Sequence, residues 1–81
     1  MLLKLTEQNT GVVNPDVIYT NEIVINSQYI QAIKKTKPNY PFTKEYSVIL
    51  MASGQVYNVK ENFDYIYNKI AKEWNYIKEK L

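Results

Sequence analysis

The sequence predicts one small α+β domain over residues 1–81, in which an antiparallel sheet of about four or five short strands packs against a single amphipathic C-terminal helix. Two observations indicate this fold class. β-branched runs separated by turn residues fill the chain from about residue 2 to residue 60. From about residue 62 to residue 81 the apolar residues recur at a helical period. A barrel-like closure of the sheet is an open alternative.

The first half of the chain predicts short strands separated by turns. Residues 2–6 form the first expected strand, and the polar residues 7–11 form the turn that follows it. Asn14-Pro15-Asp16 breaks the next apolar run, because proline fixes its own φ and disfavours a helical conformation in the residue before it. Residues 17–20 are expected to form an edge strand or a connection, and residues 22–26 a clearer strand.

The rest of the sheet is expected to contain a long loop and a hairpin. Residues 29–34 predict a strand, and residues 34–43, which include two prolines, predict the main loop. Residues 45–52 and 55–59 are both strand-like. Because Ser53-Gly54 between them is a turn signal, these two runs are expected to pair as a hairpin.

The C-terminal helix has the clearest sequence pattern of all the elements. Its apolar residues recur at spacings of three and four and form one stripe: Phe63, Ile66, Ile70, Trp74, Ile77 and Leu81. Asn62 is placed to act as the N-cap. The stripe is expected to dock on the sheet, with its members from Phe63 to Ile77 in the structural core. Truncation of Trp74 to alanine is then expected to cost about 3–5 kcal/mol.

The composition excludes several kinds of chemistry. All ten basic residues are lysine, and the chain has no arginine, histidine or cysteine. Without cysteine there is no disulfide and no thiolate, and without histidine the usual general base and the commonest metal ligand are missing. We therefore expect no enzyme activity, no catalytic or metal-binding residue and no cofactor. No apolar run approaches the roughly 18 residues of a membrane span, and the N-terminus lacks a signal peptide, so we expect a cytoplasmic protein without a membrane partner.

One segment alternates lysines with aromatic rings and is the candidate interaction surface. Its members are Lys34, Lys35, Lys37, Tyr40, Phe42, Lys44 and Tyr46. Lysines along a phosphate backbone and rings that stack on bases are typical of single-stranded nucleic-acid binding. A solvated loop whose Tyr40 and Phe42 pack on the sheet explains the same residues. The net charge of +2 and the absence of arginine favour the second interpretation, so nucleic-acid binding is expected to be weak.

Several short motifs taken in order resemble a known family. Lys4-Leu5-Thr6 is followed by Ile25-Asn26 with a step to Ile30, then by the Gly54 turn and by Tyr57-Asn58-Val59-Lys60-Glu61, which opens the helix. This order resembles the small FlbD/SwrD proteins of flagellar operons and their phage-encoded relatives. The resemblance implies a non-enzymatic protein, linked in the flagellar members to motor function.

The chain departs from that family at three places. It has Ser53-Gly54 where the family has Asn-Gly, and it has extra residues at 8–21 and 35–44. These departures favour a relative of the phage-encoded type. A weaker resemblance is to the C-terminal half of LytTR DNA-binding domains. Those domains carry basic residues where this chain has Lys60-Glu61-Asn62, so the resemblance does not imply DNA recognition.

The leading functional hypothesis is a small non-enzymatic module that binds a protein partner or itself. Its eight tyrosines exceed what the thin core of an 81-residue domain can bury, and exposed tyrosine is enriched at interfaces. A homodimer is expected, through an exposed edge at residues 22–26 or through the tyrosine-bearing helix face. The alternatives are a weak nucleic-acid binder that uses residues 34–46 and a small-ligand-binding oligomer. The second alternative requires a polar cleft that the sequence does not reveal.

Overall fold

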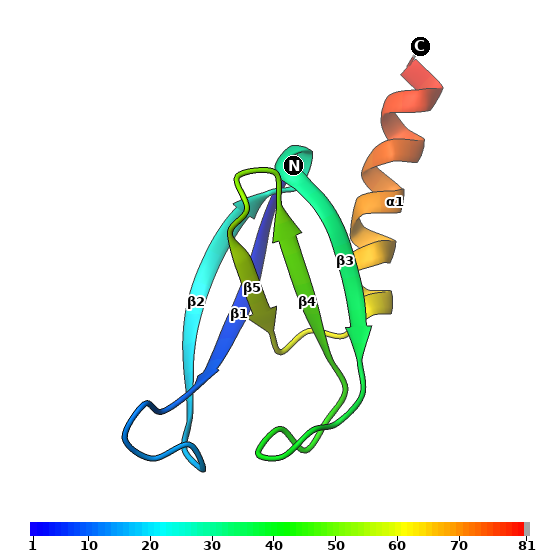
Figure 1. Ribbon diagram of the computed structural model, residues 1–81. Coiled ribbons are helices and arrows are strands. Elements are labelled where there is room, and N and C mark those ends of the chain that lie inside the picture. The colour runs from blue at the N-terminus through cyan, green and yellow to red at the C-terminus, as the bar shows by residue number, and fades with distance from the viewer. Residues whose placement is uncertain (81) are drawn as a thin grey trace.

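The computed structural model describes residues 1–80, apart from the side chains of Tyr76 and Lys80. Leu81, the last member of the predicted stripe, lies outside the described residues. The elements in chain order are β1 (Leu2–Thr10), β2 (Ile18–Asn26), a single 3₁₀ turn (Ser27–Tyr29), β3 (Ile30–Thr36), β4 (Tyr46–Met51), β5 (Val56–Val59) and α1 (Phe63–Lys80) (Figure 1). The predicted α+β class is confirmed, with five antiparallel strands and one C-terminal helix.

The sheet is open, so its barrel-like closure was a wrong alternative. The strand order is β2-β1-β5-β4-β3, and every neighbouring pair is antiparallel. β2 and β3 follow each other in the chain but lie at opposite edges of the sheet. The 3₁₀ turn at Ser27–Tyr29 redirects the chain between them, and Asn26 caps that turn by accepting a hydrogen bond from the Gln28 N–H at 3.0 Å. Both edge strands therefore keep one side without a strand partner.

The first hairpin is longer than the sequence predicts. The expected turn at residues 7–11 is wrong, because β1 continues to Thr10 and pairs with β2 along its whole length. The separate segments 17–20 and 22–26 are likewise one continuous strand from Ile18. Polar residues such as Asn9 have low strand propensity, but the ladder of nine residue pairs outweighs it.

The hairpin formed by β4 and β5 has the predicted turn. Gly54 has a φ of +92°, which a residue without a Cβ adopts at little cost, and its N–H donates to the Met51 carbonyl at 2.9 Å. The main loop is shorter than predicted, since Lys34, Lys35 and Thr36 belong to β3. These three residues pair with β4, which outweighs the loop signal of the prolines that follow.

The core lies between the inner face of the sheet and the first half of α1. Alternate strand residues meet there with one helix residue, and the buried apolar cluster consists of Leu3, Leu5, Ile25, Ile49, Met51, Val59 and Ile66. Leu3 and Leu5 point into this cluster while their neighbours Leu2 and Lys4 are exposed, as the two-residue period of a strand requires. The sequence pattern of the strands thus determines which face of the sheet is covered.

The helix docks over only half of its predicted stripe. Asn62 is the N-cap, since its Oδ1 accepts the Tyr65 N–H at 2.8 Å. Ile66 is fully buried in the core, as predicted, and the half-buried Ile70 packs against it. Phe63 is also half-buried, but it lies outside the buried cluster and the side chains packed against that cluster.

The placement of Trp74 and Ile77 in the core is wrong. Trp74 is 59% exposed and Ile77 is 42% exposed. The reason is geometric, because the second half of α1 extends past the end of the sheet and has no strand beneath it (Figure 1). A helical period predicts which residues share a face, but it does not predict how far the opposing surface extends.

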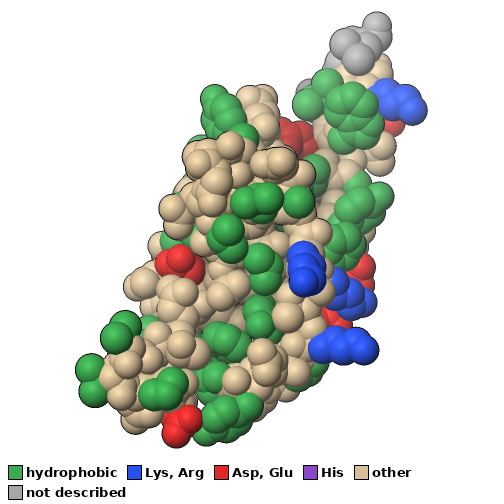
Figure 2. All heavy atoms as spheres, in the orientation of Figure 1, with side chains coloured by type: hydrophobic (Ala, Val, Ile, Leu, Met, Phe, Trp, Pro, Cys, Tyr) green, Lys and Arg blue, Asp and Glu red, His purple; other side chains and the backbone are tan. Residues whose placement is uncertain are grey.

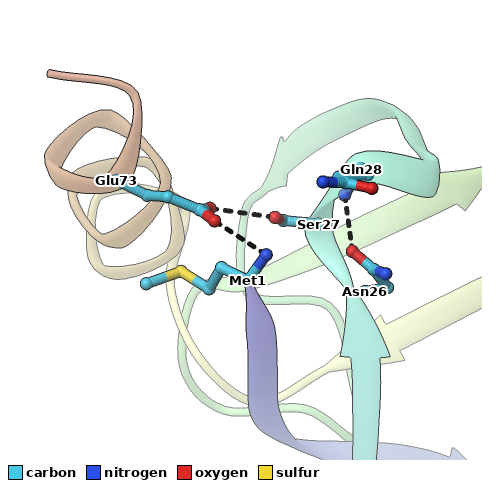
Figure 3. Close-up of polar contacts among 5 residues, drawn as sticks. All are labelled: Met1, Asn26, Ser27, Gln28 and Glu73. Atoms are coloured by element: carbon cyan, nitrogen blue, oxygen red, sulfur yellow. Dashed lines mark hydrogen bonds and ion pairs between the residues drawn. The ribbon is translucent and has the colours of Figure 1, made fainter. Parts of the chain in front are cut away.

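A polar contact attaches the middle of α1 to the end of the sheet. The Glu73 carboxylate pairs with the Met1 amino group at 2.7 Å and accepts a hydrogen bond from the Ser27 hydroxyl at 3.1 Å (Figure 3). The hydrogen bond from the amino group, followed by the one from Ser27, lowers the pKa of the Glu73 carboxyl below its ordinary value. Glu73 therefore stays ionised to a lower pH than an ordinary glutamate, and it joins the helix to both β1 and the turn after β2.

Candidate functional surfaces

The predicted lysine–aromatic surface does not form one continuous patch. Tyr46 is a buried residue of β4, and its ring lies 5.0 Å from that of Phe42, which is half-buried beside it. Lys34 and Lys35 are neighbours on β3 and so point to opposite faces of the sheet. Tyr40, in contrast, is 77% exposed at the tip of the loop.

Three of the predicted residues instead line a cleft, of mixed polar and apolar character, that the sequence did not reveal. This cleft has a volume of about 570 Å³ and lies between the first hairpin and the loop before β4. Its lining residues are Gln8, Ile18, Thr20, Phe42, Thr43, Lys44, Glu45, Tyr46, Lys60 and Asn62. Phe42, Lys44 and Tyr46 contribute from the predicted segment, whereas Lys34, Lys35, Lys37 and Tyr40 lie outside the cleft.

The cleft exists because β5 is short. β5 bridges β1 at the single residue pair Glu7–Val59, and the chain then leaves the sheet to begin α1. β1 and β2 continue beyond that point, so one side of the hairpin has no strand neighbour. The loop before β4 forms the opposite wall, and two backbone hydrogen bonds between Asn39 and Phe42, of 2.8 and 3.1 Å, close its turn.

Gln8 is the unusual residue of the cleft. It is 6% exposed, and none of the side-chain hydrogen bonds found among residues 1–80 involves its amide. Its amide atoms keep contact with solvent, since the Thr36 hydroxyl oxygen is the one fully buried side-chain N or O atom without a hydrogen-bond partner in the described part of the chain. Sequence reasoning missed Gln8 because it assigned this residue to a turn rather than to β1.

The second candidate surface is the free edge of β2. The Thr6 carbonyl accepts the Lys60 N–H at 2.8 Å, and the Thr6 N–H donates to the Glu61 carboxylate at 2.8 Å. Thr6 therefore makes no ladder bond to Glu22, its partner on β2, and the backbone groups of Glu22 point away toward the free edge. By alternation, the residues of β2 that direct their N–H and C=O groups to this edge include Ile18, Thr20, Glu22 and Val24.

The two edges of the sheet differ in composition. β3 carries Lys34 and Lys35, and Lys37 and Pro38 follow it directly. Charged residues and proline of this kind prevent edge strands from pairing with other chains. β2 is two residues longer than β3 and contains neither lysine nor proline. Its only charged residue, Glu22, is paired with Lys4 of the neighbouring strand at 2.7 Å.

Apolar and aromatic side chains are exposed on several elements. Over the strands, hydrophobic side chains lie at the surface of the face shown in Figure 2, and Val24 and Val56 are 60% and 52% exposed. The tyrosines exposed among the described side chains are Tyr19, Tyr29, Tyr40, Tyr65 and Tyr67, so the predicted excess of surface tyrosine is present. The exposed end of α1 adds Trp74 and Ile77.

Two further findings limit the kinds of site within residues 1–80. No group of three or more acidic residues is placed to hold a metal ion in this part of the chain. No helix in the same range has the length and apolar character that crossing a membrane requires.

Comparison with known proteins assigns no family. No protein-family model, no curated protein and no solved structure matches the chain. The resemblances to the FlbD/SwrD proteins and to LytTR domains therefore stay predictions from short motifs.

Proposed function

We propose that this protein is a non-enzymatic self-assembling module that dimerises by pairing β2 with β2 of a second copy. The observation that supports this most strongly is the composition of the β2 edge, which is nine residues long and has neither lysine nor proline. Unpaired backbone groups on such an edge are a template for another strand. Antiparallel pairing of two copies would join their sheets into one and satisfy those groups.

The sequence of β2 is complementary to itself in one register. A two-fold axis at Asn21 places Val24 opposite the partner's Ile18 and Glu22 opposite the partner's Thr20, with each pair occurring twice. All of these residues direct their backbone groups to the free edge, so they form the hydrogen-bonded pairs of the new ladder. On the inner face, Ile23 lies opposite the partner's Tyr19, which is 57% exposed in the single copy. Apolar side chains thus meet apolar side chains on both faces.

The neighbouring register is less favourable. A two-fold axis at Glu22 would place the two Glu22 carboxylates directly opposite each other, and like charges in that position destabilise a sheet. The axis at Asn21 avoids this repulsion and puts the two Asn21 amides in contact, where each can donate to and accept from the other. Charge therefore selects the register as well as the edge.

Sedimentation velocity at micromolar concentration tests the proposal. The wild-type chain is expected to sediment as a dimer that dissociates on dilution, and Val24→Lys is expected to give a monomer because it adds a charge at the edge. Val56→Lys is the matched control, since Val56 has a similar exposed fraction but lies on the interior strand β5. A wild-type chain that is monomeric at all concentrations, or a Val24→Lys variant that stays dimeric, would contradict the proposal.

The exposed end of α1 is the competing interface. If Val24→Lys remains dimeric while Trp74→Glu becomes monomeric, assembly runs through the helix and not through β2. The cellular setting of the module, cytoplasmic and of the phage-encoded type, rests on the sequence alone.

A further inference from the structure

The cleft beside Gln8 has the features of a ligand site, and it shares only Ile18 and Thr20 with the proposed β2–β2 interface. We propose that it binds a nucleotide as a free small molecule, with the base held by Gln8 and Phe42 and the phosphate held by Lys44 and Lys60. The volume of about 570 Å³ lies within the range of about 300–1,000 Å³ that is usual for small-molecule sites. The proposal does not rest on dimerisation, because all of these side chains belong to one copy.

The free amide of Gln8 points to a ligand with a donor and an acceptor side by side. The Gln8 side chain lines the cleft and makes none of the side-chain hydrogen bonds found among the described residues, so its solvent-accessible amide is open to a ligand. The carboxamide offers two N–H donors and a carbonyl acceptor in one plane. This arrangement matches the edge of a nucleobase, and adenine best, because its N6 amino group and N7 atom pair with glutamine in a bidentate manner.

An aromatic ring and an aliphatic side chain supply the surface for the face of the base. Phe42 is half-buried and is held at the cleft wall by contact with Tyr46, at a ring separation of 5.0 Å. Ile18 lines the cleft from β2 and is 39% exposed. Stacking on a ring of this kind is worth about 1–3 kcal/mol per base.

The charges around the cleft favour a phosphate. Lys44 and Lys60 both line it, and neither takes part in any of the ion pairs found among residues 1–80. Glu45 is the one acidic residue of the lining, and Lys35, which lies outside the cleft, pairs with it at 3.7 Å. The cleft therefore presents two uncompensated cations to a ligand.

The same charges argue against a long nucleic-acid strand. Strand-binding proteins follow the phosphate backbone with a continuous positive groove. Lys34 and Lys37 lie outside the cleft, and Lys35 is engaged with Glu45, so no row of free lysines leads from it. A single nucleotide fits these observations better than an oligonucleotide.

Amide chemical shifts of the labelled protein, titrated with adenosine 5′-monophosphate, test the proposal. Saturable shifts are expected at Gln8, at residues 42–46 and at residues 60–62, with a weaker response to uridine 5′-monophosphate. Lys44→Gln and Lys60→Gln are each expected to weaken binding about tenfold, the loss typical of one charged hydrogen bond. Lys72→Gln, an exposed lysine on α1, is the matched control and is expected to bind like wild type.

Three results would overturn the proposal. The first is an absence of saturable shifts up to about 10 mM nucleotide, which would nearly saturate a site with a Kd of about 1 mM. The second is an equal chemical-shift response to inorganic phosphate, which would show that the base does not contribute to binding. The third is binding of a single-stranded oligonucleotide without binding of the mononucleotide. Gln8→Met keeps the size of the side chain and is expected to remove the preference for adenine, and a preserved amide spectrum of this variant shows that it still folds.

Discussion

Ile66 is the residue through which α1 is joined to the sheet, and its truncation is the strongest test of the fold. Ile66→Ala removes three carbons from a side chain that is fully buried in the cluster with Leu3, Leu5 and Val59. At about 0.8 kcal/mol per buried carbon the transfer loss is about 2.4 kcal/mol, and the cavity left behind raises the expected cost to about 3–4 kcal/mol. A domain of 81 residues has a total stability of about 4–12 kcal/mol, so this loss is a large fraction of it.

Urea unfolding followed by far-ultraviolet circular dichroism measures this loss. Ile77→Ala and Trp74→Ala are the controls on the same helix, and each is expected to cost less than about 1 kcal/mol because both side chains are largely exposed. The helical stripe alone predicts a larger loss of about 3–5 kcal/mol for Trp74→Ala. The exposure of Trp74 in the structure lowers that expectation. If the controls destabilise the protein as much as Ile66→Ala does, the reasoning is refuted, since the second half of α1 would then be packed.

Two further predictions concern polar groups. The Thr36 hydroxyl is buried without a hydrogen-bond partner. Thr36→Val keeps the β-branched shape and is expected to raise the free energy of unfolding by about 1 kcal/mol in urea melts. A loss of stability would show that the hydroxyl does have a hydrogen-bond partner. The pKa of the Glu73 carboxyl is lowered in the folded state, so its stabilising effect is present above the ordinary carboxyl pKa and is lost as the pH falls through that range and below. The difference in stability between wild type and Glu73→Gln is therefore expected to shrink between neutral and acidic pH, and a difference independent of pH would contradict this.

The sequence predicted the elements that depend on local signals. The hairpin at Gly54, the N-cap at Asn62 and the buried face of the first half of α1 follow from turn chemistry, capping and helical period. Each of these signals involves residues that are close in the chain. Local rules therefore suffice for them.

The sequence did not predict the features that depend on distant parts of the chain. The continuation of β1 to Thr10 depends on its pairing with β2, and the exposure of Trp74 depends on where the sheet ends. The cleft forms because β5 stops at Val59 while β1 continues, and no local pattern reports that difference in strand length. Gln8 is consequently an ordinary polar residue in sequence, whereas in the structure it is largely enclosed and lines the cleft.

The proposed pairing of β2 with β2 about Asn21 is tested most directly by disulfide formation between single cysteines placed at that position. Because the chain has no cysteine of its own, Asn21→Cys introduces one thiol at the proposed axis. In the proposed register the two positions form a non-hydrogen-bonded pair with a Cα separation of about 4.5 Å, within the range of about 4.4–6.8 Å that a disulfide spans. Under mild oxidation the variant is expected to form a disulfide-linked dimer rapidly, and the control Val56→Cys, on the interior strand β5, is expected not to. Equal crosslinking of the two variants, or none for Asn21→Cys at a concentration where the wild-type chain is dimeric, would contradict pairing through this edge.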